Sequence, residues 1–434
     1  MRSVRQTTNR FFFVLGFSCL TLSVFKTEAQ ENSPYSRYGL GDLVPAQNIL
    51  NRGMGGLTSA FTDYQAVNFN NPASYTGLKI TTLDVGLDYT SRTLKTLNPP
   101  KKFNSSYLIP SYVQIGLPLS KKKNWGMNIG LRPISRINYD IINEKRVAGV
   151  DSIRYNYFGN GGTYQAFAGM AYGTKNLSVG FNAGYMFGTK EYSTRVSFIN
   201  DTVAYKSTNS ADTAHFGGLF LNAGIQYKIK LNKKTYMRLG LNSNLKSTLN
   251  ATKNTIRETI EYNSNVGLQQ IDSVYKGVEQ KGTILYPSSW ATGIMIESED
   301  SWMIGAEFNV ANWADYRYFG EADKMQNTWT ARLGGQFMPN NKSTKFWERV
   351  MYRFGASFGS EPVQINKSVP NYSITFGTGL PVRRNVYTNQ YTTINTAFEL
   401  GVRGNKSNDI RENIFRLSLG FNLSDIWFNK PKYQ

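Results

Sequence analysis

The chain has 434 residues, a formal net charge of +20 and a mean hydropathy of −0.40. Beyond the N-terminus no apolar run approaches the roughly 18–20 residues of a membrane-spanning helix, which excludes a helical membrane protein. The single cysteine, Cys19, lies in the N-terminal leader, so the mature chain has no disulfide, thiol chemistry or cysteine-ligated metal.

Residues 1–29 are predicted to be a secretory signal peptide. Three arginines precede a mostly apolar core at 11–25, and Thr27-Glu28-Ala29 offers a small-x-small cleavage site. A lipoprotein signal ending at Cys19 is an alternative, but the two residues before the cysteine match that signal poorly. Either signal directs the chain out of the cytoplasm.

Residues 30–78 are predicted to be an irregular plug, or hatch, inside a barrel formed by residues 79–434. Glycine and proline recur too often here for long helices or strands, and the many tyrosines and phenylalanines argue against a disordered linker. An apolar segment without regular structure must satisfy its backbone polar groups, and the barrel lumen is the available place.

Strict alternation of apolar and polar residues recurs along the rest of the chain and predicts β-strands. Residues 177–187 place Leu, Val, Phe, Ala and Tyr on one face and mainly Ser, Gly and Asn on the other. No helical segment covers the apolar face, and charges fall almost always on the polar one, which is typical of a barrel in lipid. A large soluble β-sandwich is the alternative. We predict an all-β fold, a transmembrane antiparallel β-barrel of about fourteen strands, near residues 79–91, 107–119, 124–139, 161–173, 177–195, 213–230, 235–249, 281–297, 301–316, 327–338, 350–362, 371–380, 391–403 and 412–424.

The connections between these strands differ in length and orient the barrel. Outer-membrane barrels have short periplasmic turns and long extracellular loops, whereas a soluble sandwich gives no reason for such an order. The phasing places the protein in the outer membrane with both chain ends in the periplasm. Short turns lie near 120–123, 173–176, 231–234 and 297–300, and long polar stretches near 140–160, 196–212 and 250–280.

Two motifs in the predicted hatch resemble the long-chain fatty-acid transporter family of FadL-like outer-membrane barrels, and specifically its Bacteroidota members. They are Asn51-Arg52-Gly53-Met54-Gly55-Gly56 and Val67-Asn68-Phe69-Asn70-Asn71-Pro72-Ala73, and the chain ending at 419–428 is similar to the closing strand of Bacteroidota barrels. The resemblance implies a fourteen-stranded barrel whose hatch plugs the lumen. It also implies passage of hydrophobic molecules through the hatch and sideways through a gap in the wall. The hatch or gate residues predicted in this way are Gly53, Gly55, Gly56, Asn71 and Pro72.

Pro133 is predicted to kink the third strand. Proline has no N–H to give to a strand ladder, and a closed barrel has no edge strand to accommodate it. Family members kink the third strand to open the wall, so we predict Pro133 as the lateral-opening kink. The alternative is that this strand has already left the membrane at Pro133.

Eight charged residues are predicted to face the lumen from the strands. Buried charges are costly unless they are paired, so most of them should anchor the hatch, and a minority could meet a ligand. They are Asp84, Asp88, Arg132, Glu307, Arg332, Glu399, Arg403 and Arg416.

No catalytic or metal site is predicted. His215 is the only histidine, and no distinctive serine motif accompanies it, so an outer-membrane lipid hydrolase is a distant alternative. One histidine and no mature cysteine cannot make a typical metal cluster. We expect no catalytic residue, metal or cofactor.

The predicted function is passive, hatch-gated admission of hydrophobic or amphipathic, fatty-acid-like small molecules with lateral exit. The type IX secretion accessory barrels share a similar start and fold, so a scaffold for protein secretion or surface assembly is the alternative. Lys and Arg are scattered through turns and strand ends, which favours phosphates of membrane lipid or lipopolysaccharide over nucleic acid as the counter-charge. We expect a monomer.

Overall fold

The computed structural model describes residues 33–97, 99–120, 124–147, 151–199, 206–263, 267–298, 301–383 and 391–425. The predicted signal peptide at 1–29 lies outside these residues. Within the described ranges, no helix has the length and apolar character needed to cross a membrane.

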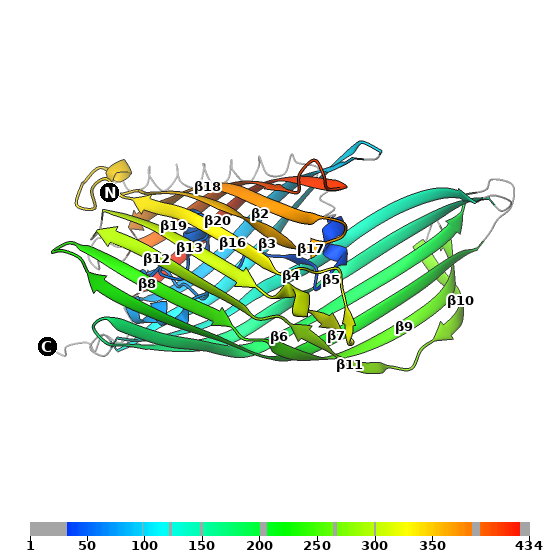
Figure 1. Cartoon of the computed structure of the whole chain (residues 1–434), viewed down its shortest axis with the longest axis horizontal. Coiled ribbons are helices and arrows are strands. Elements are labelled where there is room, and N and C mark those ends of the chain that lie inside the picture. The colour runs from blue at the N-terminus through cyan, green and yellow to red at the C-terminus, as the bar shows by residue number, and fades with distance from the viewer. Residues whose placement is uncertain are drawn as a thin grey trace, which may run out of the picture.

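The strands close into a fourteen-stranded antiparallel barrel, which confirms the predicted fold class (Figure 1). The first wall strand, β2, pairs along its whole length with the last, β20. β8 and β9 are two parts of one wall strand, and β10, β11 and β12 are parts of the next. The wall consists of β2 (Thr81–Thr96), β3 (Lys101–Ser120), β4 (Trp125–Val147), β5 (Asp151–Gly173), β6 (Leu177–Phe198), β7 (Ser207–Lys230), β8 (Thr235–Asn244), β9 (Ser247–Asn263), β10 (Gly267–Lys276), β11 (Gln280–Tyr286), β12 (Ser289–Ser298), β13 (Trp302–Ala311), β16 (Thr328–Phe337), β17 (Met351–Gln364), β18 (Ser368–Arg383), β19 (Tyr391–Arg403) and β20 (Ile410–Asp425).

Alternation along the strands separates a lipid-facing surface from a filled lumen. On β20, Phe415 and Leu423 are exposed on the outside, whereas Arg416 and Asn422 between them are buried inside. Large apolar side chains are exposed in the same way around the wall, for example Leu219, Ile374 and Leu400. A water-soluble protein would not expose a continuous band of this kind, and the hydrocarbon of a membrane covers it.

The long polar stretches predicted as loops are mostly strands, which corrects the sequence analysis. β4 and β5 extend through most of 140–160, β7 begins at Ser207, and β9 and β10 form a hairpin within 250–280. In Figure 1, β5, β6, β7 and β9 reach far beyond the end of β2 and β16. Beyond the membrane both faces of a strand meet water, so apolar alternation no longer marks the strand.

The N-terminal segment lies inside the barrel, as the fold prediction requires (Figure 1, blue). Its short elements are η1 (Pro34–Arg37), β1 (Asp42–Leu43), α2 (Ile49–Arg52) and η2 (Pro72–Gly77). Asn48 caps α2, because its side chain accepts the N–H of Asn51 at 2.8 Å. We call residues 33–78 the hatch. A second insertion, the connection between β13 and β16, carries η3 (Trp313–Asp315), β14 (Arg317–Tyr318) and β15 (Glu321–Ala322), while η4 (Phe346–Glu348) precedes β17.

Candidate functional site: hatch and wall seam

The Gly-Met-Gly-Gly segment of the hatch lies against glycines of the wall. Gly55 has φ +71° and Gly56 φ +85°, so both adopt a backbone conformation that side chains disfavour. A Cβ added to Gly53 would come within 3.2 Å of the Cα atom of Gly377 on β18. On β17, a Cβ at Gly355 would lie 2.0 Å from the backbone nitrogen of Gly55. Hatch and wall backbones therefore touch directly here.

The Asn-Pro-Ala segment makes a second close contact, on the opposite arc of the wall. The side chain of Asn71 donates to the carbonyl of Ser59 at 2.5 Å and accepts the N–H of Ala73 at 3.1 Å. Pro72 begins η2, where its fixed φ favours the first helical position. A Cβ at Gly180 or Gly224 would collide with Pro72 or Asn71, so wall glycines again provide the space.

Four of the eight predicted inward charges bond the hatch directly, and a fifth, Arg332, supports one of them. Glu307 on β13 accepts the N–H groups of Thr58 and Ser59, each at 2.6 Å, and Arg332 on β16 donates to the same carboxylate at 2.8 Å. Buried Asp88 on β2 forms an ion pair with buried Arg52 of the hatch. Arg132 donates to the hatch carbonyl of Ala46, and Arg403 forms an ion pair with Asp42 of the hatch. Charge-assisted bonds of this kind are stronger than neutral ones.

The remaining predicted charges face the lumen but reach the hatch indirectly or not at all. Asp84 is buried and accepts from Tyr112 and Gln114, each at 3.1 Å. Glu399 and Arg416 form an ion pair at 2.5 Å between neighbouring strands of the wall. This pair joins β19 to β20 without a hatch residue.

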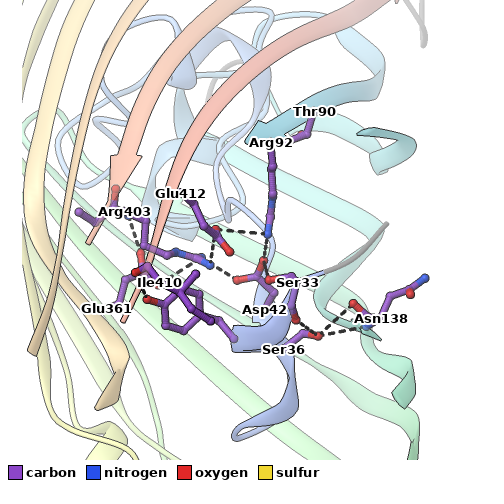
Figure 2. A network of polar contacts seen from close by, with 12 residues as sticks. Ser33, Ser36, Asp42, Thr90, Arg92, Asn138, Glu361, Arg403, Ile410 and Glu412 are labelled. Carbon is purple, nitrogen blue, oxygen red and sulfur yellow. Dashed lines mark hydrogen bonds and ion pairs between the residues drawn. The ribbon is translucent and has the colours of Figure 1, made fainter. Parts of the chain in front are cut away.

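A buried charge network holds the outer end of the hatch (Figure 2). Asp42 pairs with Arg92 of β2 and, at 2.6 Å, with Arg403 of β19, which also bonds Glu412 of β20 at 3.1 Å. Burial opposes ionisation of Asp42, but the Arg403 and Arg92 guanidinium groups outweigh it and hold the pKa of this carboxyl well below its usual range. Tyr35 closes the network by donating to the carbonyl of Ile410 at 2.7 Å.

Of the charged residues just described, only Arg403 was predicted from the sequence; Asp42, Arg92 and Glu412 were not. Arg92 and Glu412 both lie at positions of their strands that face the lumen. The predicted strand 79–91 ended one residue before Arg92, and Glu412 was the first residue of the predicted strand 412–424. Asp42 lies in irregular sequence with no periodic signal. Extending each strand through its polar end would have found the two wall residues.

The connection between β13 and β16 folds into the lumen and covers the hatch. Its Asp323 accepts the N–H of Gly39 at 2.7 Å, and β14 pairs with β11 at Tyr318 and Ile284. Lys190 of β6 donates to the carbonyl of Gly39 at 2.5 Å and lies 4.5 Å from the centre of the Tyr318 ring. The predicted strand at 301–316 is too long, because β13 ends at Ala311 and residues 313–315 form η3. The remainder of the connection was predicted only as a gap between two strands.

The wall is incompletely paired on one side. The ladder between β3 and β4 ends at the pair Val113 and Leu131, two residues before Pro133. Beyond this point β4 keeps its pairing with β5, with a bulge between Pro133 and Ser135, while β3 residues 101–112 pair only with β2 among the described strands. We call the unpaired edges of β3 101–112 and β4 132–147 the seam.

The hatch occupies the β4 edge of this seam. β1 pairs with β4 at Leu43 with Ser135, and the N–H of Val44 donates to the carbonyl of Ile134 at 3.0 Å. The N–H of Ser33 also donates to the carbonyl of Asn138, at 2.9 Å. The hatch thus replaces a wall strand for backbone hydrogen bonding.

Apolar side chains pack between hatch and wall below the seam. Phe69 makes an edge contact with Tyr112 of β3 at 5.5 Å between ring centres and lies 6.2 Å from Phe167 of β5. Arg132 stacks over Phe69 at 4.7 Å and donates to the hatch carbonyl of Ala46 at 3.0 Å. Together with Leu40 and Ile49 these rings belong to the main apolar cluster of the lumen.

The only histidine and the acidic side chains of the described residues do not gather into a metal-binding group. His215 lies on β7 opposite Thr189 and Thr252, with its side chain exposed. Across the ranges described above, no group of three His, Cys, Asp or Glu side chains is placed to hold a metal ion.

Comparisons with known proteins agree with this architecture. A family model described as BamG matches residues 11–434. A FadL homologue from Pseudomonas aeruginosa is 12% identical, with a TM-score of 0.59 over 88% of this chain and 99% of that one. The toluene transporter TodX of Pseudomonas putida is 16% identical, with a TM-score of 0.56 over 89% and 99%. The toluene transporter TbuX of Ralstonia pickettii is 14% identical, with a TM-score of 0.55 over 87% and 98%. A search of curated protein sequences gives no significant match. The resemblance to FadL-like barrels is confirmed at the level of the fold.

Proposed function

This chain is a member of the BamG family, and we propose that its barrel passively admits hydrophobic or amphipathic, fatty-acid-like small molecules. The hatch is the gate, and the seam between β3 and β4 is the exit toward the membrane. The observation that carries the proposal is the seam itself, where two neighbouring wall strands do not pair and a hatch strand fills one edge.

The chemistry around the seam supports such a route. A hydrophobic solute that passes the Phe69, Tyr112 and Phe167 rings meets apolar surface on the way to the wall. At the seam it reaches exposed Leu108 on β3, which faces hydrocarbon. Leaving sideways keeps the solute out of the polar vestibule at the short-turn end, a hollow of about 910 Å³ lined by charged residues such as Lys79, Lys228 and Glu297. TbuX and TodX, which share this fold, are toluene transporters, and toluene is a small hydrophobic molecule.

A disulfide across the seam tests the exit. Leu43 and Ser135 are directly opposed in the β1–β4 pairing, where Cα atoms lie ~4.5–5.5 Å apart, within the range of a disulfide. We expect the variant Leu43→Cys/Ser135→Cys, reconstituted in liposomes, to take up a fluorescent long-chain fatty acid when reduced. After oxidation, uptake should fall to the rate of protein-free liposomes, because the hatch strand can no longer leave the seam.

The matched control joins two wall strands away from the hatch. Thr378 and Thr396 are opposed on β18 and β19, so Thr378→Cys/Thr396→Cys should cross-link equally well and leave uptake unchanged. Equal uptake by the oxidised and reduced seam variant would contradict lateral exit. Loss of uptake in the oxidised control would mean that cross-linking itself damages the barrel.

A scaffold function in protein secretion or surface assembly is the second candidate. The observation that favours it is the ordered sheet of β5, β6, β7 and β9, which extends well past the rest of the barrel (Figure 1). Replacing residues 256–276, the β9–β10 hairpin, with a two-residue turn separates the two functions. If the protein is a scaffold, this variant should display other surface proteins poorly while uptake stays normal. If it is only a channel, the display of other surface proteins should not change.

A further inference from the structure

Three cationic side chains, Arg411, Lys95 and Lys102, lie side by side on the outer face of the barrel, and we call them the row. The strand register places Lys95 of β2 directly opposite Arg411 of β20 on one side and Lys102 of β3 on the other. Their neighbours Leu94 and Glu412 are buried in the lumen, so alternation directs the three cations outward. Like charges that face each other across strands destabilise a sheet. An anion bound by the row would remove this repulsion.

No protein group neutralises the row within the described chain. None of the three side chains forms an ion pair there. Exposed Asp409, which precedes β20, accepts from Asn366 at 3.2 Å and forms no ion pair with the row. The Nε atom of Arg411 is buried and has no hydrogen-bond partner among the described residues.

A hollow opens on the lipid-facing wall next to the row. It has a volume of about 680 Å³ and spreads over β17, β18, β19, β20 and β2. Ala356 and Ser91 are small among large outward side chains, which leaves the space. Its walls are apolar, with polar groups at Thr93 and Asn413, whose Oδ1 atom is also buried without a partner. The apolar lining includes Tyr372, Ile374, Leu400 and Phe415.

The row lies where lipid headgroups lie. Ser91 of β2 lines the hollow, and Lys95 lies four residues further along the strand, a distance of ~13 Å. On β20, the residues that face outward are apolar from Phe415 onward, so the hydrocarbon begins there. The row also lies at the end opposite the short turns, which face the periplasm in barrels of this type. The cations therefore sit at the outer-leaflet surface, above an apolar hollow that reaches into the hydrocarbon.

We propose that Arg411, Lys95 and Lys102 bind the phosphates of an outer-leaflet phosphoglycolipid of the lipid A type, with an acyl chain in the adjoining hollow. A free phosphate would satisfy the row but leave the hollow empty. A neutral lipid would fill the hollow but leave the repulsion within the row. A lipid with phosphates at the surface and several acyl chains below matches both features.

Lipid binding to the intact barrel in detergent tests the proposal. Native mass spectrometry would follow titration with bisphosphorylated lipid A, dephosphorylated lipid A, phosphatidylglycerol and inorganic phosphate. We expect preferential binding of bisphosphorylated lipid A. In Lys95→Gln/Lys102→Gln/Arg411→Gln its affinity should fall roughly fivefold per cation, about a hundredfold in total.

Two further variants separate charge from shape. Lys175→Gln/Lys233→Gln/Lys234→Gln removes three exposed cations at the short-turn end and should bind lipid A as the wild type does. Ala356→Phe fills the hollow and should weaken lipid A without removing a charge. Heat-modifiable migration on gels verifies that each barrel is folded. Unchanged affinity in the first triple variant would overturn the proposal, as would equal binding of lipid A and phosphatidylglycerol by the wild type.

Discussion

The carboxylate of Glu307 gives the sharpest test of how the wall holds the hatch. It accepts two hatch N–H groups at 2.6 Å and is itself paired with Arg332 at 2.8 Å. Glu307→Gln keeps the shape of the side chain and removes its charge. The amide can still accept a hatch N–H, but its NH₂ group cannot accept from the arginine.

The loss of docking free energy in Glu307→Gln depends on Arg332, which the substitution leaves without its ionic partner. Breaking a buried ion pair by neutralising one member costs ~3–5 kcal/mol, and the lower end applies because the Arg332 side chain is 15% exposed. A loss of ~3 kcal/mol in hatch docking corresponds to roughly a hundredfold higher population of the undocked state. Removing both charges in Glu307→Gln/Arg332→Met should lessen the loss, because no unpaired guanidinium remains.

Hydrogen exchange of residues 57–61 measures this population, since their amides exchange when the segment leaves the wall. We expect roughly a hundredfold loss of protection in Glu307→Gln. The matched control is Glu399→Gln, which breaks the wall pair with Arg416 and touches no hatch residue. Unchanged protection of 57–61 in Glu307→Gln would refute the assignment of Glu307 as an anchor, and equal losses in both variants would refute its specificity.

Two further predictions concern hatch packing and pH. Gly355→Ala should displace the hatch and raise single-channel conductance in planar bilayers, because its Cβ would lie 2.0 Å from the Gly55 nitrogen; Gly401→Ala, with its nearest atom at 3.6 Å, should behave as wild type. Asp42 has a lowered pKa, so its stabilisation is present above the unfolded value of about 4 and disappears only as pH falls through the lower folded value. Exchange protection of 33–44 should therefore be equal at pH 7 and 5, and Asp42→Asn should lose it at pH 7. A fall in protection between pH 7 and 5 would contradict the ionised, paired state of Asp42.

The barrel could be predicted from the sequence because the membrane imposes a strict rule on each strand. Residues in hydrocarbon must alternate with residues in the lumen, and this rule placed all eight predicted charges inside. The rule stops at the membrane surface, which is why the ends of β4, β5 and β9 were missed. The kink at Pro133 stays a prediction, which rests on the missing N–H of proline. The hatch strand that pairs with β4 beside it, Asp42–Leu43, is two residues long and has no pattern that a sequence could reveal.

The partners of the predicted charges could not be derived in the same way. Glu307 meets Thr58 across 249 positions of the chain, and Arg403 meets Asp42 across 361. Such contacts depend on the path of an irregular segment through a closed space, which local sequence does not encode. The folding of residues 312–327 into the lumen could not be predicted for the same reason, because these residues also form an irregular segment.

The partners of Asp42 also bear on how the molecule is assembled. Arg92 belongs to the first strand of the wall, Arg403 and Glu412 to the last two, and the circle closes between β2 and β20. A single carboxylate from the interior therefore bridges the joint at which the cylinder is completed. The same ion pairs therefore hold the hatch in the lumen and tie together the two ends of the wall, so losing the hatch would also weaken the joint.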